Sequence, residues 1–223
     1  MKIAVYSRDG GAMREERLSR MLERLGKESF DLYGIGGGGD ILPGTDLVMS
    51  VGGDGTFLSA SQCVGKSGIP ILGVNLGRLG FLSEYSPEEA GEALLSGGWY
   101  LEDRELLDTK VSGDVPDNGQ RFWPYTLNEV SVHRSGAALL GIDVTIDGHP
   151  LPTYWADGLL VATSSGSTAY SLSVGGPICA PEAKVLIIAP IAPHNLNARP
   201  LVVPDTTRVT VSMRSRDDGV MLS

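Results

Sequence analysis

The hydrophobic pattern of the chain changes its period near residues 97–98, and this change limits the folds that are possible. Before that point, short apolar runs alternate with stretches in which apolar residues recur every three or four positions, as over residues 18–25. After it, apolar and polar residues tend to alternate, and no helical pattern of comparable strength follows. Strands that alternate with helices favour a parallel sheet. The sequence therefore predicts an α/β domain over residues 1–98, followed by an all-β domain over residues 99–223.

The predicted α/β domain is built from three apolar runs and three helical stretches. They predict strands over residues 3–6, 47–51 and 70–74 and helices over residues 18–25, after the glycines at 52–55 and over residues 87–95. The last helix has the clearest start, because Ser86 and Glu89 have the spacing of a capping box and Pro87 occupies the first helical position. Gly26 and Gly97 stand where the first and third helices are expected to end. This order of elements predicts a Rossmann-like parallel sheet.

The predicted β domain reveals its strands through alternation and through short apolar runs. Residues 142–146 alternate strictly and lead into Asp147–Gly148, a dipeptide typical of tight hairpin turns. Further strands are predicted over residues 159–163, 185–189 and 209–213. Because these strands follow one another without strong helices between them, we expect most of the domain to be antiparallel.

Charge and composition exclude several classes of protein. The chain has 18 lysines and arginines against 27 aspartates and glutamates, and no basic cluster dense enough for nucleic acid. Its apolar runs are shorter than the about 20 residues that a membrane-spanning helix needs. Two cysteines, Cys63 and Cys179, and three scattered histidines exclude a disulfide framework and argue against a zinc site. No secretory signal opens the sequence, so we expect a cytoplasmic protein without nucleic-acid or membrane partners.

One glycine tract imitates a nucleotide-binding fingerprint. Residues 34–39 match G-x-G-x-x-G, in which the last glycine must open a helix. Pro43 and Gly44 follow, and the next strand is predicted from residue 47, so no helix fits in between. We therefore expect a surface loop at this tract.

A second glycine group, residues 52–56, has the context that the first one lacks. It follows a predicted buried strand and leads into a predicted helix, so its backbone N–H groups and the helix N-terminus could receive a phosphate. The group has no lysine, which excludes a Walker A loop. The alternative is structural, because Asp54–Gly55 also suits a tight turn that caps a helix. The loop alone leaves both interpretations open.

From this loop to near its end, the chain resembles the NAD kinase family. Residues 52–56 are similar to the family's Gly-Gly-Asp-Gly-Thr motif, which diacylglycerol, sphingosine and 6-phosphofructo kinases share. What is specific to NAD kinases is the order of the further segments. These are residues 73–82, the pair Asn128–Glu129, residues 157–170 with Gly-Ser-Thr-Ala-Tyr at their end, residues 175–177 and residues 193–200.

The resemblance implies a reaction and its participants. The terminal phosphoryl group of ATP, or of polyphosphate in some members, would move to the 2′-hydroxyl of the adenosine ribose of NAD. Mg²⁺ would serve as the divalent metal, and the protein would form a homodimer or homotetramer. Asp54 would take the ribose proton as general base. The residues implied to bind nucleotide are Gly52, Gly53, Gly55, Thr56, Leu58, Asn75, Phe81, Asn128, Glu129, Asp157, Ser165, Thr168, Ala169 and Tyr170.

The resemblance assigns different tasks to the residues of the second half. The amide of Asn128 can pair with a purine edge, and the carboxylate of Glu129 can accept from two vicinal ribose hydroxyls. Asp157 would lie near the nicotinamide carboxamide. Ser165 and residues 168–170 would form the wall of the dinucleotide site.

Each segment also has a structural interpretation. Asn128–Glu129 could be the start of a strand, residues 165–168 a helix-capping turn, and Phe81 a core side chain. His194 suits a structural, proline-bounded turn, and His133 stands isolated. Two functional alternatives complete the set: a lipid or sugar kinase with the same glycine loop, and an NAD-binding sensor without catalysis.

The chain departs from the family pattern at three places. Ser164 occupies a position that is usually proline, and Trp155–Ala156 precede Asp157 where a small residue is common. The sequence stops at Ser223, where family members usually continue. We therefore expect it to lack the family's last segment.

Overall fold

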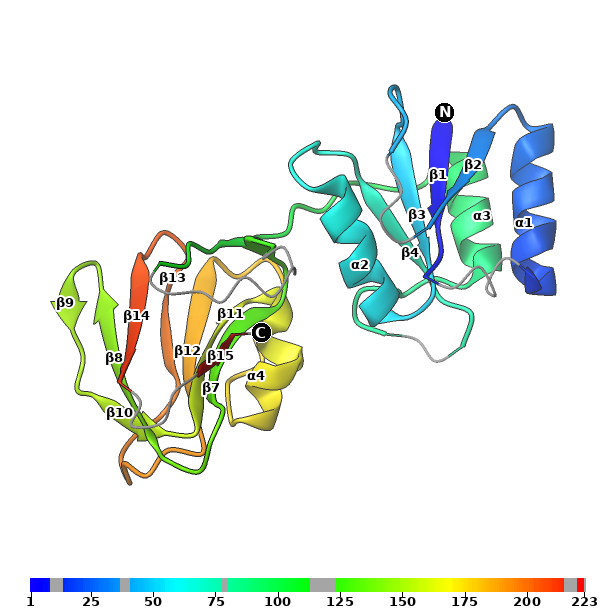
Figure 1. The fold of residues 1–223 in the computed structure, drawn as a ribbon. Helices are drawn as coiled ribbons and strands as arrows, with labels where there is room; N and C mark the ends of the chain where they lie inside the picture. The colour runs from blue at the N-terminus through cyan, green and yellow to red at the C-terminus, as the bar shows by residue number, and fades with distance from the viewer. Residues whose placement is uncertain (9–13, 37–40, 78–79, 113–122, 215–219, 223) are drawn as a thin grey trace. The chain divides into compact units, whose positions relative to one another are not determined.

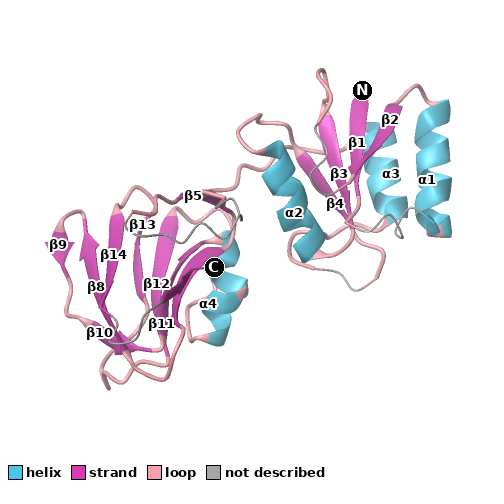
Figure 2. Ribbon diagram, in the orientation of Figure 1, coloured by secondary structure: helices cyan, strands magenta, loops and turns pink. Residues whose placement is uncertain are grey.

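The computed structural model describes residues 1–8, 14–36, 41–77, 80–112, 123–214 and 220–222. The chain divides into two compact units, Met1–Glu102 and Asp103–Ser223, whose elements are drawn in Figures 1 and 2. None of the helices in the described ranges combines the length and the apolar composition that crossing a membrane requires.

The first unit is a parallel sheet with helices on both faces. Its strands are β1 (Lys2–Tyr6), β2 (Asp31–Ile35), β3 (Leu47–Val51) and β4 (Ile71–Val74), in the order β2-β1-β3-β4, and its helices are α1 (Glu16–Lys27), α2 (Asp54–Val64) and α3 (Pro87–Ser96). α1 and α3 cover one face, where Met49 packs with Leu18 and Leu94. α2 covers the other face, where Val48 packs with Ala60. The sheet is buried on both sides, so the central strand β3 is a continuous buried run.

Two details of the first unit differ from the predictions. α1 ends at Lys27 rather than at Gly26, because the left-handed residue after the helix is Ser29, with φ of 67°, and the N–H of Phe30 bonds back to the carbonyl of Leu25. β2 was not predicted, although Asp31–Ile35 pairs with β1 along its whole length. The expected surface loop over residues 34–39 is therefore wrong for residues 34–35, and residues 37–39 lie outside the described ones.

The boundaries of α3 confirm the capping prediction. The hydroxyl of Ser86 accepts from the N–H of Glu89 at 3.3 Å, and the Glu89 carboxylate accepts from the N–H of Ser86 at 2.9 Å. Pro87 begins the helix and Gly97 ends it with φ of 67°. The box therefore satisfies N–H groups that have no partner within the helix.

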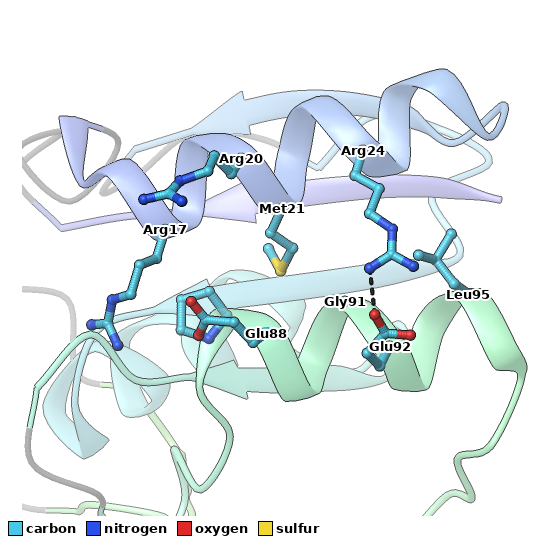
Figure 3. A pocket seen from close by; sticks show the side chains of 9 residues that line it. Arg17, Arg20, Met21, Arg24, Glu88, Gly91, Glu92 and Leu95 are labelled. Carbon is cyan, nitrogen blue, oxygen red and sulfur yellow. Dashed lines mark hydrogen bonds and ion pairs between the residues drawn. The ribbon is translucent and has the colours of Figure 1, made fainter.

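Helices α1 and α3 approach each other closely at Gly91. A Cβ at this position would lie 2.9 Å from Cγ of Met21. On the exposed side of the contact, Arg24 forms an ion pair with Glu92, as Figure 3 shows. The groove that these residues line contains none of the predicted nucleotide-binding residues.

The second unit is a sandwich of two antiparallel sheets. One sheet has the order β10-β8-β14, from β8 (Leu140–Ile146), β10 (Tyr154–Ala156) and β14 (Val209–Arg214), with β9 (His149–Pro150) also paired to β8. The other has the order β13-β12-β11-β7-β15, from β7 (Glu129–Arg134), β11 (Gly158–Thr163), β12 (Val185–Ile191), β13 (Leu201–Pro204) and β15 (Val220–Leu222). Ile142 of the first sheet shares a buried cluster with Val132 and Leu159 of the second, which places the core between the two sheets. A separate short pair joins β5 (Leu107–Asp108) and β6 (Tyr125–Thr126).

The outer face of the five-stranded sheet carries two short helical turns. They are a 3₁₀-helix, η2 (Ser165–Thr168), and α4 (Tyr170–Ser173). Val174, which follows α4, packs on Leu160 and Ile187 of that face. The prediction of an all-β second half therefore omits these turns, which are too short to leave a helical period in the sequence.

The predicted hairpin is confirmed. Asp147 and Gly148 have φ of 49° and 83°, and the register pairs Ile146 with His149 directly across them. Positive φ at both central residues matches the twist of an antiparallel pair. The fold class is thus as predicted, with a parallel sheet and helices first and antiparallel sheets second.

We expect Ser86→Ala to lower the free energy of unfolding by about 1 kcal/mol, because the Glu89 N–H loses its acceptor at the start of α3. Urea denaturation of the whole chain measures the change. Ser61→Ala serves as the control, since this hydroxyl bonds only to the carbonyl of Leu58 within α2, and its effect should stay within about 0.5 kcal/mol. Equal losses for the two variants would contradict the capping role.

Candidate functional site

The loop that follows β3 turns sharply into α2. Gly52 has φ of 146°, and a Cβ on it would lie 2.4 Å from Oγ1 of Thr56, so only glycine fits there. Gly53 is the N-cap of α2 and makes no side-chain cap. A Cβ on Gly53 or on Gly55 would meet no atom of the described residues within 4 Å, chain neighbours apart. The fold therefore requires Gly52, whereas open space surrounds the two other glycines at an uncapped helix N-terminus.

The carboxylate of Asp54, the first residue of α2, receives three backbone N–H groups from one turn. Its Oδ1 accepts from Leu82 and Ser83 at 3.0 Å each, and its Oδ2 accepts from Phe81 at 2.9 Å. A Cβ on Gly80 would lie 2.1 Å from Oδ1 of Asp54, so the turn can come this close only with glycine. Asp54 thus ties the start of α2 to a segment 27 to 29 residues later in the chain.

Asn75 secures the same turn from the end of β4. Its amide donates to the carbonyl of Ser83 at 3.2 Å, and its Oδ1 accepts from the N–H of Gly77 at 2.8 Å. Phe81, at the turn, is 66% exposed, so the interpretation of Phe81 as a core residue is wrong. The structure therefore brings Asp54, Asn75 and Phe81 together, while Leu58 lies one turn further along α2, half-buried.

In the second unit, Asn128 and Glu129 lie beside η2. Glu129 begins β7, as the strand-start interpretation predicts. The carbonyl of Asn128 accepts from the N–H of Thr163 at 2.9 Å, and a Cβ on Gly166 would lie 2.1 Å from this carbonyl oxygen. The 3₁₀-helix therefore packs directly on the backbone of Asn128.

Two polar atoms in this group are buried and unpartnered among the described residues. They are Oε2 of Glu129 and Oγ of Ser165. Burial raises the pKa of the Glu129 carboxyl, and the N–H of Tyr170, which this carboxyl accepts, opposes the rise. Residues 165–168 form the 3₁₀-helix η2, which leads directly into α4, and the N-cap residues of η2 and α4, Ser164 and Ala169, make no side-chain cap. Buried polar atoms without partners are costly, which makes these two candidates for contact with a bound molecule.

His133, isolated in the sequence, contacts a predicted site residue in the fold. Its ring stacks on Tyr170 with centroids 5.9 Å apart and planes at 12°, and its Nε2 lies 2.9 Å from the hydroxyl of Ser131. Glu129, Ser131 and His133 alternate along β7, so they share one face of the sheet. In the sequence, only the alternation of polar and apolar residues along β7 indicated that these three side chains lie on one face. Thr168 and Ala169, half-buried, connect η2 to α4 just before Tyr170.

Asp157 lies at the opposite end of the β7–β11 pair. Its carboxylate forms an ion pair with Arg134, Oδ1 to Nε at 2.7 Å, and both side chains are 35% exposed. Asn128 precedes β7, whereas Arg134 ends it, so roughly 20 Å of strand separates Asp157 from Asn128. The structure does not bring Asp157 into the group of Glu129 and Ser165.

Two of the three departures from the family pattern have local structural accounts. The hydroxyl of Ser164 donates to the carbonyl of Pro181 at 2.8 Å, a bond that proline could not make. Trp155 packs over Gly141, where a Cβ would lie 3.2 Å from the indole ring. The N–H of Trp155 donates to Oδ1 of Asn195 at 2.7 Å, so Asn195 provides a side-chain bond in the proline-bounded turn that contains His194.

The predicted site residues thus form one group in each unit, with Asp157 apart from both. No group of three His, Cys, Asp or Glu side chains that could hold a metal ion gathers within the described ranges. An uncapped helix N-terminus can receive an anion, and the unpartnered atoms of Glu129 and Ser165 can bond to hydroxyl groups.

Models of known families match both units. Residues 41–96 match the ATP-NAD kinase N-terminal domain, and residues 127–222 match the ATP-NAD kinase C-terminal domain. The two matches together cover most of the chain. They include every residue that the resemblance assigned to nucleotide binding.

Individual proteins are similar over much of the chain. A curated NAD kinase from Bacteroides fragilis is 45% identical over 182 residues, and one from Flavobacterium psychrophilum is 43% identical over 182 residues; each match covers 80% of this chain and 61% of the relative. The chain thus spans less than two thirds of the length of these curated relatives.

Solved structures share the fold. An NAD kinase from Archaeoglobus fulgidus in complex with ATP has a TM-score of 0.76 and 28% identity, covering 99% of this chain and 86% of that one. Yeast NADH kinase complexed with NADH has a TM-score of 0.78 and 25% identity, covering 100% of this chain and 72% of that one. Because two domain models, the curated relatives and both structures agree, the chain belongs to the NAD kinase family.

Proposed function

We propose that the protein transfers the terminal phosphoryl group of ATP to the 2′-hydroxyl of the adenosine ribose of NAD, giving NADP. The observation that carries this proposal is the loop after β3, where a Cβ on Gly53 or Gly55 would meet no other atom of the described residues. Glycine without a packing reason is expected where a ligand approaches the backbone. The structures of relatives with ATP and with NADH support the choice of nucleotides.

The N-terminus of α2 would hold phosphate groups. Its first N–H groups have no side-chain cap, and the helix dipole adds about half a positive charge there. Thr56 lies within the first turn, where its hydroxyl can contribute a further hydrogen bond. Charge neutralisation and positioning are the main demands of phosphoryl transfer.

The group in the second unit would hold the ribose and the base of NAD. Oε2 of Glu129 and Oγ of Ser165 would gain from a ribose hydroxyl the hydrogen bonds that the chain does not supply. Asn128 would pair with the adenine edge, and Tyr170 would form part of the wall. Asp157 would act from the far end of the strand pair, near the nicotinamide, with its orientation set by Arg134.

Asp54 would act on the attacking hydroxyl through its one remaining lone pair. A carboxylate offers about four acceptor positions, and three of them receive the N–H groups of residues 81–83. The fourth, on Oδ2, can accept from a ribose hydroxyl and take its proton during transfer. The attacking oxygen gains little charge early in a loose transition state, so an oriented acceptor suffices.

The described part of the chain contains no set of protein side chains that would by itself bind the metal implied by the resemblance. The carboxylate within the loop, Asp54, already accepts three N–H groups, and no metal-ligating cluster is present in those ranges. Mg²⁺ commonly binds nucleotide phosphates and keeps several waters. We propose that it enters with ATP and neutralises phosphate charge. Assembly into a homodimer or homotetramer stays a prediction, which analytical ultracentrifugation measures.

The direct test incubates the chain with ATP, Mg²⁺ and NAD and measures NADP with an NADP-specific dehydrogenase. We expect NADP to form in proportion to protein and time. Separate assays with polyphosphate in place of ATP, and with NADH in place of NAD, determine which phosphoryl donors and acceptors the protein uses. NAD binding by calorimetry without NADP would support the sensor alternative. If neither NAD binding nor NADP formation is seen and a lipid or sugar is phosphorylated instead, the result would support the lipid or sugar kinase alternative.

We expect Gly53→Ala and Gly55→Ala to raise KM for the nucleotides by about tenfold or more, because the added methyl group occupies space that the ligand needs. Their unfolding free energies should stay within about 1 kcal/mol of the original. Gly26→Ala is the control, since its Cβ also meets open space but lies in α1, and its KM should not change. Unchanged KM in all three variants would remove the support that the loop lends to the proposal.

We expect NAD affinity to fall as the pH drops through the raised pKa of Glu129, because the protonated acid no longer accepts from two hydroxyls. The loss should begin above the pH at which an ordinary glutamate titrates, about 4.3. The free energy of unfolding responds to pH in the opposite direction. Because the pKa of Glu129 is raised in the folded state, lowering the pH protonates this carboxyl and removes the cost of its buried charge. Calorimetry between pH 8 and pH 5 measures the affinity. Glu129→Gln should bind more weakly and lose this dependence; the same pH profile in both proteins would contradict the role.

A further inference from the structure

The strongest unexplained feature is the position of Phe81. Its ring is 66% exposed, so packing in the core does not hold it. What holds its backbone is a set of hydrogen bonds from residues 81–83 to Asp54. An exposed aromatic side chain on a fixed backbone is suited to contact a planar ligand.

We infer that Asp54 is a positioning residue for Phe81, in addition to the role at the ribose hydroxyl. The carboxylate fixes the turn of residues 80–83, and through this turn it sets where the Phe81 ring meets the nucleotide. The hydrogen bonds to Asp54 fix the turn whatever the protein binds, whereas the contact of the ring with a nucleotide rests on the proposed function.

The geometry admits only a carboxylate of this length. Asparagine would place an NH₂ group opposite the N–H of Phe81 or opposite those of Leu82 and Ser83, so at least one donor would lose its acceptor. Glutamate would push its longer side chain against Gly80, which already lies in tight contact with Oδ1. An alanine at Asp54 would leave all three N–H groups without their acceptor.

The turn has a second support that does not replace the first. Gly73 in β4 allows close approach, since a Cβ there would lie 2.4 Å from the carbonyl oxygen of Leu82. The Asn75 amide donates to the carbonyl of Ser83. These contacts hold the carbonyl side of the turn, whereas Asp54 alone accepts the N–H groups of residues 81–83. Loss of Asp54 should therefore loosen the Phe81 end of the turn first.

A pure base role and a positioning role predict different effects on NAD binding. If Asp54 contacts only the ribose hydroxyl, Asp54→Asn and Phe81→Ala change the Kd for NAD independently, and their effects add in the double variant. If Asp54 also positions Phe81, Asp54→Asn weakens NAD binding by at least the factor seen for Phe81→Ala. The double variant should then bind no more weakly than Asp54→Asn alone, because that change already removes the Phe81 contact.

The test first measures amide hydrogen exchange of residues 81–83 in the ligand-free full chain. We expect exchange in Asp54→Asn to be about tenfold faster or more, because a charge-assisted acceptor is lost. Asp46→Asn is the matched control: this carboxylate accepts a single N–H, that of Lys2, in the same unit, so exchange at 81–83 should not change. Unchanged exchange in Asp54→Asn would overturn the inference.

A second variant covers failure of Asp54→Asn to fold. Gly80→Ala leaves Asp54 intact but drives the turn away from Oδ1, and we expect it to accelerate exchange at 81–83 in the same way. The Kd for NAD is then measured for all variants and for Asp54→Asn with Phe81→Ala. Additive losses would overturn the link to Phe81. If the unaltered chain binds no NAD, the proposed function fails, and the exchange result still decides whether Asp54 fixes the turn.

Discussion

The first unit depends on one junction, at which β3 ends, α2 begins and the segment after β4 returns. Gly52 makes the sharp exit from the strand possible, and Asp54 then receives three N–H groups from residues 81–83. These bonds link elements that are distant in the sequence at the carboxyl end of two neighbouring parallel strands. Ligands bind at this edge in open parallel sheets, since loops gather there and helix N-termini point toward it. The same carboxylate therefore serves the fold and stands where the proposed chemistry takes place.

The second unit differs from the first, because one face of its larger sheet carries a line of polar side chains. The core lies between the two sheets, while the outer face of the larger sheet carries Glu129, Ser131 and His133 along one strand. The short turns η2 and α4 pack on this face, and Oε2 of Glu129 and Oγ of Ser165 are buried there without a partner among the described residues. Burial raises the pKa of the Glu129 carboxyl although it accepts the N–H of Tyr170, and a buried oxygen without a partner lowers stability. Such a cost is typical of a surface shaped for a ligand rather than for stability alone.

Much of the fold follows from local patterns. The buried run of β3, the helical period of α1, the capping box of α3 and the Asp147–Gly148 hairpin each depend on a few neighbouring residues, so the sequence predicts them. The errors arise where contacts between distant parts of the chain decide the structure. β2 begins with Asp31 and contains Gly34, so its pairing with β1 rather than its own pattern makes it a strand. Phe81, apolar in type, is exposed because its turn is held by backbone bonds and not by its side chain.

The sequence by itself determined the two-part fold, the position of the glycine loop and the family, since periodicity and the order of motifs can be read along the chain. It could not sort the glycines, because contact distances separate Gly52 and Gly80, which packing requires, from Gly53 and Gly55, which border open space. It could not show that His133 meets Tyr170, that Arg134 holds Asp157, or that Asp54 holds the turn at 80–83. These relations join residues through strand register and through loops that return from afar, and only the tertiary structure brings such atoms within bonding distance.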